Sequence, residues 1–271
     1  MEQNKTYKRV LSIAGSDSGG GAGIQADIKT ISACGCFATT AITAVTVQNT
    51  LGVESVFGLP IENIEGQINA VLSDIGTDSI KIGMLHSAEI VRCVAKMIQK
   101  YGIKNVVLDP VMVSTSGHKL ITDDAISVLS EVLAPLAAII TPNIPEAEIL
   151  IGEKINKNSE LPTIAQRLAE KYHTSIYLKA GHLTEDKLTD IFYNYKTKNV
   201  SELTSQRLYT PNTHGTGCTL SSALASGLAL GKTMEETAQF AHDYLAQAIV
   251  AGAEYKIGNG HGGVKHFWKF W

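Results

Sequence analysis

The sequence predicts an α/β fold in which a mainly parallel sheet is covered by helices on both faces. Short β-branched runs alternate with helical patterns along all 271 residues, and this alternation is typical of a parallel sheet with helices on both sides. Hydrophobic residues make up 44% of the chain and charged residues 18%, which excludes a disordered chain. No composition break, low-complexity linker or repeat divides the chain, so a single domain over residues 1–271 is expected.

The strands are predicted where β-branched and other apolar residues cluster in short runs. The first helix is expected from about Ala22 to Ala33, directly after a glycine-rich turn. The predicted strands are, in chain order, Val10–Ala14, Ala41–Val47, Ser79–Gly83, Asn105–Val113, Ala137–Thr141 and Ser175–Leu178, with a candidate edge strand at Asp190–Tyr195.

Three further helices are predicted from their end signals and their composition. Ser87 has the position of an N-cap, and Gly102 has the position of a helix stop. The small residues of Thr219–Leu230 indicate a closely packed helix. Thr233 and Glu236 form a capping box, which predicts the start of the last helix.

Composition also narrows the function classes. Lys plus Arg is 23 and Asp plus Glu is 26, so the formal charge of −3 offers no basic surplus for nucleic acid. The longest apolar stretch, near Val132–Ile140, is too short to span a bilayer, and residues 1–9 lack an apolar signal region. The four cysteines show neither a C-x-x-C pair nor zinc-ligand spacing. A cytoplasmic protein that binds neither nucleic acid nor a membrane is expected.

The first candidate site is the glycine-rich turn at residues 15–23, because ligands of such sheets bind beyond the carboxyl ends of the strands. Glycines there let backbone amides approach a ligand closely. The turn is neither a P-loop nor a dinucleotide fingerprint, since the closing Gly-Lys-Ser/Thr and the G-x-G-x-x-G spacing are both missing. Asp17 and Asp27 lie near it and could bind a polar small molecule. A flexible connection is the alternative.

The second candidate site is the segment Asn-Thr-His-Gly-Thr-Gly-Cys at residues 212–218, which precedes a predicted helix. Free N–H groups and the dipole at a helix start favour an anion, and they would hold the charge that develops on a transferring phosphoryl group. Cys218 would lie in the first turn, where the pKa of a thiol falls and the thiolate can act as a base. The alternative is a small hydrophobic residue buried at a helix–sheet contact.

The third set consists of charged and amide side chains at strand ends. Asn143 and Glu146 are three residues apart at a helix start and could hold hydrated Mg²⁺ through water, and Asp109 ends another strand. Glu146 can equally be a first-turn carboxylate that the helix dipole favours. Lys179 follows a strand and could reach a phosphate as a point charge.

The fourth set could bind a flat ring. The Gln48 amide offers a donor and an acceptor side by side, which suits the edge of an aminopyrimidine. Met84 and Val111 also lie just past strands and could sandwich the ring. Ordinary core packing is the alternative for each. His182 and His214 could touch phosphates.

Together these motifs resemble the ribokinase-like superfamily, and within it the hydroxymethylpyrimidine/phosphomethylpyrimidine kinases of thiamin biosynthesis. The resemblance implies a three-layer α/β/α sandwich, ATP and Mg²⁺ as cofactors, and a homodimer. It also implies two transfers from ATP, first to the hydroxymethyl oxygen of the pyrimidine and then to the monophosphate. The segments that carry it are 14–17, 20–29, 44–50, 81–85, 106–112, 141–148 and 212–219.

The resemblance implies a role for each candidate residue. Gln48 is expected to pair with the pyrimidine, and Gly215–Cys218 to form the anion hole, with Cys218 in the place of a base. The rest of the substrate pocket is expected to be Gly15, Asp27, Met84 and Val111. The other implied sets are Gly215, Gly217, Lys179 and Cys218 for catalysis, Lys179, Asn143, Thr213 and Thr216 for ATP, and Asp109 and Glu146 for Mg²⁺.

The sequence departs from the family pattern near the phosphates. Thr115-Ser116-Gly117 lacks a lysine that is often found there, so one positive group is missing. Gly19 replaces the usual serine of the glycine-rich turn, and Ala180 replaces a glycine after Lys179. Residues 113–120, rich in Ser, Thr and Gly, are a candidate lid.

Two alternative functions remain open. A pyridoxine or pyridoxal kinase would act on a similar ring, although Gln48-Asn49-Thr50 favours the aminopyrimidine. A non-catalytic ligand-binding module on the same fold is the alternative of another class. The joint presence of Asp109, Glu146, Lys179 and Cys218 argues against it. An α/β hydrolase is excluded because no Gly-x-Ser-x-Gly elbow follows a strand.

Overall fold

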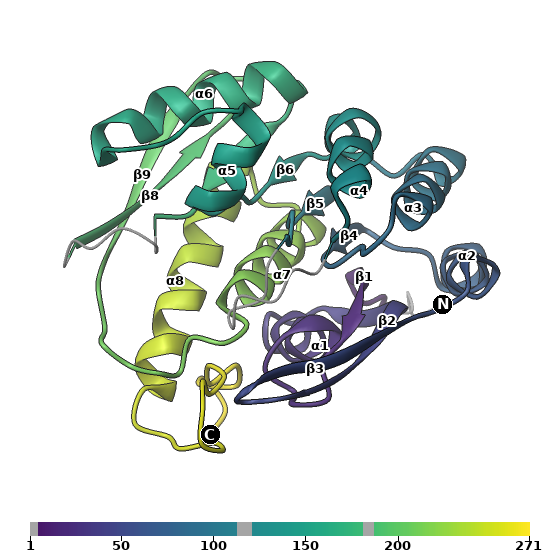
Figure 1. The fold of residues 1–271 in the computed structure, drawn as a ribbon, viewed down its shortest axis with the longest axis horizontal. Helices are drawn as coiled ribbons and strands as arrows, with labels where there is room; N and C mark the ends of the chain where they lie inside the picture. The colour runs from purple at the N-terminus through teal and green to yellow at the C-terminus, as the bar shows by residue number, and fades with distance from the viewer. Residues whose placement is uncertain (1–4, 113–120, 181–186) are drawn as a thin grey trace.

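The computed structural model of the protein describes residues 5–112, 121–180 and 187–271. Its strands are β1 (Arg9–Ser16), β2 (Phe37–Asn49), β3 (Gly52–Gly58), β4 (Ser79–Ile82), β5 (Val106–Leu108), β6 (Ile139–Ile140), β7 (Ser175–Leu178), β8 (Lys187–Tyr193) and β9 (Val200–Gln206). They form one sheet in the order β3-β2-β1-β4-β5-β6-β7-β8-β9 (Figure 1). Six neighbouring strands of this order, β2, β1, β4, β5, β6 and β7, are parallel. The strands β3, β8 and β9 pair antiparallel. The predicted α/β class with a mainly parallel sheet is confirmed.

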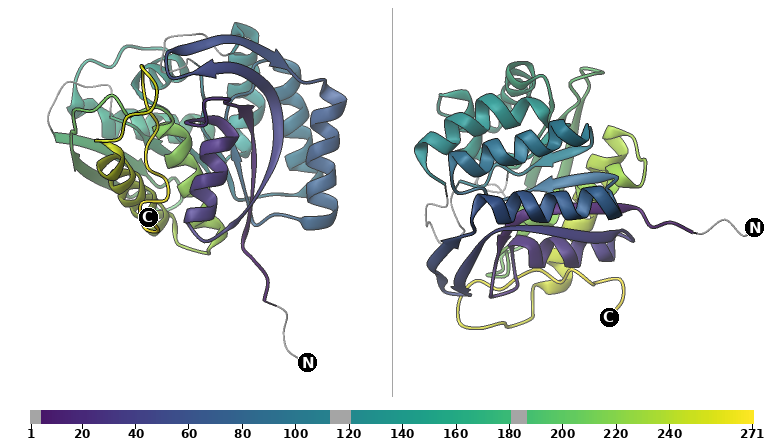
Figure 2. Two further views of the ribbon diagram at one scale, coloured as in Figure 1. Left: turned by 90° about the horizontal axis from the view of Figure 1, so that it is seen from below. Right: turned by 90° about the vertical axis from the view of Figure 1, so that its right-hand side faces the viewer.

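Helices cover both faces of the sheet and make the predicted three layers (Figure 2). One face carries α2 (Ile61–Ala70), α3 (Ala88–Tyr101), α4 (Asp123–Val128), α5 (Ile144–Ile151) and α6 (Leu161–Tyr172). The other face carries α1 (Gly23–Ala33), α7 (Thr216–Ala229) and α8 (Met234–Gly252). Short helical turns lie at η1 (Val71–Ile75), η2 (Leu129–Leu133), η3 (Ala134–Leu136) and η4 (Asn158–Glu160).

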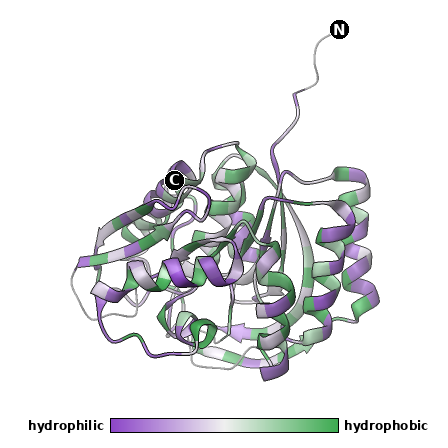
Figure 3. Cartoon of the chain, turned by 90° about the horizontal axis from the view of Figure 1, so that it is seen from above, coloured by the Kyte–Doolittle hydropathy of each residue, from purple (hydrophilic) through white to green (hydrophobic). Residues whose placement is uncertain are grey.

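The two faces of the sheet have separate hydrophobic cores because successive strand residues point to opposite sides. In β1, Leu11 and Ile13 belong to the core under α2–α6, whereas Val10 belongs to the core under α1, α7 and α8. The flanking helices carry alternating hydrophilic and hydrophobic bands along their length (Figure 3), as expected for helices with one face on a sheet. Residues 219–229 of α7 are all buried, which explains the small side chains of that helix.

The end signals of the helices are confirmed. The Ser87 side chain accepts a hydrogen bond from the Ile90 amide at the start of α3, and Gly102 ends that helix in the left-handed conformation. Thr233 and Glu236 form the predicted capping box of α8. In these two helices, local hydrogen-bonding chemistry sets the helix ends.

Several strand boundaries differ from the prediction. β2 extends to Asn49, so Gln48 lies inside the strand, next to an irregularity in its pairing with β3. β5 is only three residues long, because Pro110 has no amide hydrogen to continue the pairing. The predicted edge strand at Asp190–Tyr195 is wrong in its place. β8 lies between β7 and β9, and β9, a polar strand that the periodicity did not reveal, forms the edge.

Within the described ranges 5–112, 121–180 and 187–271, none of the helices combines the length and the apolar character that crossing a bilayer requires.

Candidate active site

A cavity of 1170 Å³ opens at the edge of the sheet where the parallel strands end. Residues that follow β1, β4, β5, β6 and β7 contribute to it, together with the first turn of α7 and one face of α8. The cavity brings together all but one of the predicted site residues, namely Gly15, Gln48, Met84, Asp109, Val111, Asn143, Glu146, Lys179, Thr213, Gly215, Thr216, Gly217 and Cys218.

Asp27 is the exception, because its side chain does not border the cavity. Its carboxylate is fully buried and lies 2.8 Å from the Lys81 ammonium group, which is also fully buried. The hydroxyls of Ser12 and Ser222 donate to it at 2.6 and 2.8 Å. Since a buried charge needs a partner and hydrogen bonds, Asp27 serves as the counter-ion of Lys81. Lys81 itself borders the cavity, and sequence reasoning missed it.

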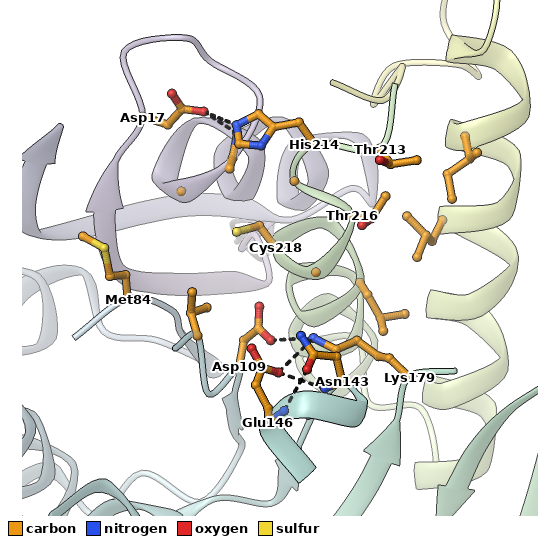
Figure 4. Close-up of a pocket in the computed structure, with 18 of the residues that line it drawn as sticks. Asp17, Met84, Asp109, Asn143, Glu146, Lys179, Thr213, His214, Thr216 and Cys218 are labelled. Carbon is orange, nitrogen blue, oxygen red and sulfur yellow. Dashed lines mark hydrogen bonds and ion pairs between the residues drawn. The ribbon is translucent and has the colours of Figure 1, made fainter. Parts of the chain in front are cut away.

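Lys179 lies between two carboxylates, Asp109 just after β5 and Glu146 in the first turn of α5 (Figure 4). Its ammonium nitrogen is 3.0 Å from Asp109 Oδ1 and 3.8 Å from Glu146 Oε2. The Thr141 hydroxyl donates to Asp109 Oδ1 at 3.0 Å. The backbone of Lys179 pairs with that of Asn143, which keeps this lysine beside the start of α5. The cluster therefore places the charged Lys179 ammonium group in the cavity wall.

Glu146 has two contacts of different kinds. It completes the capping box of α5, because its Oε2 accepts from the Asn143 amide at 2.8 Å while its own amide donates to Asn143 Oδ1 at 2.9 Å. The same carboxylate faces Lys179. Burial raises the pKa of Glu146 to about 7, although Lys179 acts in the opposite direction. The expected first-turn carboxylate of α5 is confirmed, and the same carboxylate borders the charged cluster, where its role toward Mg²⁺ stays a prediction.

The donor set fits Mg²⁺ in one particular way. The part of the chain that the structure describes contains no group of three or more His, Cys, Asp or Glu side chains that could hold a metal ion. Asp109 and Glu146 nevertheless present two carboxylates to one cavity. Mg²⁺ commonly binds through one or two carboxylates together with phosphates and water, so these two residues suit a phosphate-linked Mg²⁺.

The first turn of α7 approaches both the glycine-rich turn and the charged cluster. Gly215 is its N-cap, with a φ of 80°, and a Cβ there would overlap the carbonyl oxygen of Gly21. A Cβ on Gly217 would lie 3.3 Å from Asp109 Oδ2 and 3.4 Å from Lys179 Nζ. The helix start thus faces Lys179 without an intervening side chain, which is a suitable arrangement for an anion.

Cys218 lies in this first turn, between the two labelled groups of residues in the view of Figure 4. Burial raises the pKa of its thiol to about 11, although the nearby Lys81 ammonium group lowers it. The direction of this pKa shift is opposite to the one expected for a thiol at a helix start. Desolvation of the sulfur outweighs the favourable position at a helix start, and the thiol is protonated at neutral pH.

At one end of the cavity, Gln48 lies next to His214 and Asp17. His214 Nε2 is 2.9 Å from Asp17 Oδ2 and 3.2 Å from the Gln48 amide nitrogen. Met84 lies against Gly15, where a Cβ would come within 2.5 Å of its terminal methyl group. Met84 and Val111 both border the cavity, as the flat-ring hypothesis requires.

The opposite end of the cavity was missed from the sequence. It is lined by apolar side chains from β8, α8 and the segment after β9, namely Leu188, Leu208, Leu245, Ile249 and Val250, with Asp190 and His242 among them. His242 and Asp190 both lie against the buried Tyr177 hydroxyl, at 3.2 and 3.1 Å. The spacing of residues 242, 245 and 249 along α8 is the one signal that indicated a cavity-facing stripe.

Two predictions concern residues outside the described part of the chain. The candidate lid at residues 113–120 and the predicted phosphate contact His182 both fall there.

Comparison with known proteins places this arrangement in context. Residues 17–265 match the family profile described as phosphomethylpyrimidine kinase. A hydroxymethylpyrimidine/phosphomethylpyrimidine kinase of Rhizobium meliloti is 44% identical over 262 residues, which are 96% of this chain and 97% of that protein. The protein of the same name from Bacillus subtilis is 40% identical over 260 residues, covering 96% and 94%.

Solved structures of two kinds of kinase are similar. Phosphomethylpyrimidine kinase from Clostridium difficile 630 superposes with a TM-score of 0.79 at 40% identity, covering 89% of this chain and 99% of that one. Pyridoxal kinase from Staphylococcus aureus, in complex with AMP-PCP and pyridoxal, superposes with a TM-score of 0.88 at 32% identity, covering 97% and 94%.

Proposed function

This chain belongs to the phosphomethylpyrimidine kinase family, and on that premise we propose that it phosphorylates 4-amino-5-hydroxymethyl-2-methylpyrimidine and then the resulting monophosphate. ATP is the phosphoryl donor, and the pathway is thiamin biosynthesis in the cytoplasm. A single kinase domain carries both transfers. One observation carries the proposal: a single cavity holds the Gln48 amide at one end, an apolar face of α8 at the other, and the Lys179 cluster between them.

The two ends of the cavity suit the two substrates. Gln48 offers an acceptor and a donor to the amino group and ring nitrogen of the pyrimidine, with Met84 and Val111 beside the ring. The apolar stretch of β8 and α8 suits the base and sugar of ATP, with Thr213 and Thr216 near its phosphates. The phosphoryl group then lies next to Lys179 and the start of α7.

Transfer depends on position and charge, because phosphoryl transfer needs little covalent chemistry from the protein. The amides of Gly215–Cys218 and the Lys179 ammonium group stabilise the negative charge on the transferring group. Asp109 and Glu146 would hold Mg²⁺, and the bound ion would supply neutralisation of the ATP phosphates. Asp109 also holds Lys179 in place at 3.0 Å.

Cys218 orients the hydroxymethyl group in this proposal, because its thiol is protonated at neutral pH. Cys218→Ser keeps a hydroxyl that can also orient the substrate, so kcat is expected to fall by about 10-fold or less. A true general base is worth about 10²–10⁴-fold, and the serine variant would then lose that much. Cys218→Ala, which keeps no polar atom, is expected to lose more than the serine variant. Steady-state kinetics of both variants measures the difference, and equal losses would contradict the orienting role.

Glu146 makes the activity depend on pH. Its pKa is raised to about 7 by burial, so below that pH the free enzyme holds a neutral carboxyl that binds Mg²⁺ poorly. We expect kcat/KM for MgATP to rise with pH through about 7 and to level off above it. Glu146→Gln should lower kcat/KM and remove this rise. Glu148→Gln, on the same helix but outside the cavity, is the control and should keep the profile. A rise that persists in Glu146→Gln contradicts the assignment.

Pyridoxal is the alternative acceptor, since the S. aureus neighbour is a pyridoxal kinase. Gln48→Met is expected to raise KM for the hydroxymethylpyrimidine by roughly 10–100-fold, because two hydrogen bonds to the ring edge are lost. KM for pyridoxal should change much less, since that ring has no amino group to pair with the amide. An equal rise in KM for both acceptors, measured by ADP release, would contradict the assignment of Gln48. A non-catalytic binding module would release no ADP with any acceptor.

A homodimer is part of the same proposal. Val45, Val47 and Phe57 on the outer face of β2–β3 are 44%, 54% and 69% exposed, and Leu51 at the turn between these strands is 67% exposed. Exposed apolar patches of this kind mark association surfaces. Sedimentation equilibrium should give twice the mass of one chain, and Phe57→Asp should reduce it to one.

A further inference from the structure

One ring nitrogen of His214 contacts two side chains, one of which needs a hydrogen-bond donor and the other an acceptor. His214 Nε2 lies 2.9 Å from Asp17 Oδ2 and 3.2 Å from the atom assigned as Gln48 Nε2. A carboxylate can only accept a hydrogen bond, and an amide NH₂ can only donate one. A ring nitrogen offers either one hydrogen or one lone pair, so it cannot satisfy both groups as they are assigned.

Asp17 decides the matter because its charge is fixed. Oδ1 accepts from the Gly19 amide at 2.8 Å, and Oδ2 accepts from the amides of Gly21 and Ala22 at 3.1 and 2.8 Å. Burial would raise the pKa of Asp17, but the hydrogen bonds from His214, Ala22 and Gly19 hold it below its usual range. Asp17 is thus an acceptor, and His214 Nε2 carries the hydrogen.

The Gln48 amide must then present its oxygen to His214. Its N and O atoms are distinguished only by their hydrogen-bond partners, so the network assigns the orientation. The other end of the amide lies 3.0 Å from Thr46 Oγ1, whose one hydrogen is directed to the Ser16 carbonyl oxygen at 2.9 Å. Thr46 Oγ1 therefore accepts from the amide nitrogen. In the turned amide, the nitrogen donates to Thr46 Oγ1 and the oxygen shares the His214 Nε2 hydrogen with Asp17 Oδ2, whereas the opposite orientation places two donors against each other at His214.

We propose that Asp17 and His214 are positioning residues that fix the direction of the Gln48 amide and thereby select the acceptor ring. The inference rests on the proposed function. In this orientation the amide keeps one lone pair on oxygen and one N–H for a ligand. Those two groups match the amino donor and the ring-nitrogen acceptor of an aminopyrimidine in a single pose. A ring without the amino group leaves the oxygen unpaired.

The backbone around His214 holds its ring in this position. A Cβ on Gly21 would lie 2.5 Å from His214 Cδ2, so the ring rests against the bare backbone of the glycine-rich turn. On the other side, the His214 amide donates to the Gly262 carbonyl at 3.0 Å. The C-terminal segment thus holds His214 and the glycine-rich turn holds Asp17, although 197 residues separate these two side chains.

A double-mutant cycle tests this relay from Asp17 through His214 to Gln48. The dissociation constant of 4-amino-5-hydroxymethyl-2-methylpyrimidine is measured by calorimetry, without nucleotide, for wild type, His214→Phe, Gln48→Met and the double variant. We expect His214→Phe to raise Kd about 10-fold, as the loss of one or two oriented hydrogen bonds implies. In the Gln48→Met background the same change should alter Kd by less than about 2-fold, because its effect passes through Gln48. Independent, multiplying effects of the two substitutions overturn the inference.

Two further variants keep the test decisive. His261→Phe makes the same change at an exposed histidine of the neighbouring C-terminal segment and should leave Kd unchanged. If His214→Phe does not fold, Asp17→Ala takes its place in the cycle: it removes the carboxylate that accepts from His214 Nε2, so Gln48 loses its fixed direction. In turnover assays His214→Phe and the Asp17 variant should raise KM for the pyrimidine and change kcat by less than about 3-fold, whereas His261→Phe should change neither.

Failure of the relay can be told apart from failure of the proposed function. Wild-type protein that binds the pyrimidine but transfers no phosphoryl group overturns the proposed function alone, and the cycle remains readable from Kd. Wild-type protein that does not bind the pyrimidine overturns both. Wild-type activity with additive effects in the cycle overturns only the relay.

Discussion

Replacing Lys179 with methionine is expected to lower kcat by about 10²–10³-fold, the usual effect of removing one preorganised donor to a developing charge. The Lys179 ammonium group lies 3.0 Å from Asp109, faces the first turn of α7 at Gly217, and borders the cavity between the two proposed substrate ends. Its charge is most important when negative charge spreads over the transferring phosphoryl group. KM for the pyrimidine should therefore change much less than kcat.

The control for this variant is Lys96→Met. Lys96 pairs with Glu65 at 3.0 Å on the surface, far from the cavity residues, and such exposed pairs contribute little. Both variants are measured by steady-state ADP release and by thermal unfolding, since Lys179→Met leaves two buried carboxylates without their partner. If folded Lys179→Met keeps kcat within about 3-fold of wild type, Lys179 does not act on the phosphoryl group.

Replacing Gly215 with alanine is expected to lower kcat by about 10²-fold or more and to lower the melting temperature. A Cβ at this position would overlap the Gly21 carbonyl oxygen, so the start of α7 must move away from the glycine-rich turn. A displacement of about 1 Å in a positioning element can cost about 10²-fold in rate, and here it moves the anion hole and Cys218 together.

Gly102→Ala separates overlap from backbone strain. Gly102 also has a positive φ, of 63°, but a Cβ there meets nothing within 4 Å. Its variant should lose roughly 1–2 kcal/mol of stability, from the left-handed conformation alone, and keep full activity. Gly215→Ala with the activity of Gly102→Ala would show that the contact between the two turns does not position the site.

The sequence was informative wherever local chemistry decides the outcome. Ser87, Gly102 and the Thr233–Glu236 capping box mark helix ends through hydrogen bonds within a few residues, and the structure has them as predicted. Residues just past parallel strands, such as Asp109 and Lys179, converge because the topology brings those strand ends together.

The remaining features depend on contacts between distant segments. Asp27 lies near the glycine-rich turn in sequence. In the fold, however, its carboxylate forms a buried ion pair with Lys81, which is 54 residues away. Cys218 occupies a helix start, yet the burial that raises its pKa comes from the packing of other elements. The hydrophobic periodicity of the sequence is too weak to predict the polar strand β9 or the side of α8 that faces the cavity. The orientation of Gln48 depends on Asp17 and His214, which only the folded chain brings together.

The most direct test of the central claim is ADP release from MgATP by the purified protein, with hydroxymethylpyrimidine, its monophosphate and pyridoxal offered in parallel. We expect turnover of both pyrimidines, with pyridoxal slow or silent. Preference for pyridoxal would contradict the assignment and would mean that the Gln48 amide does not select the acceptor.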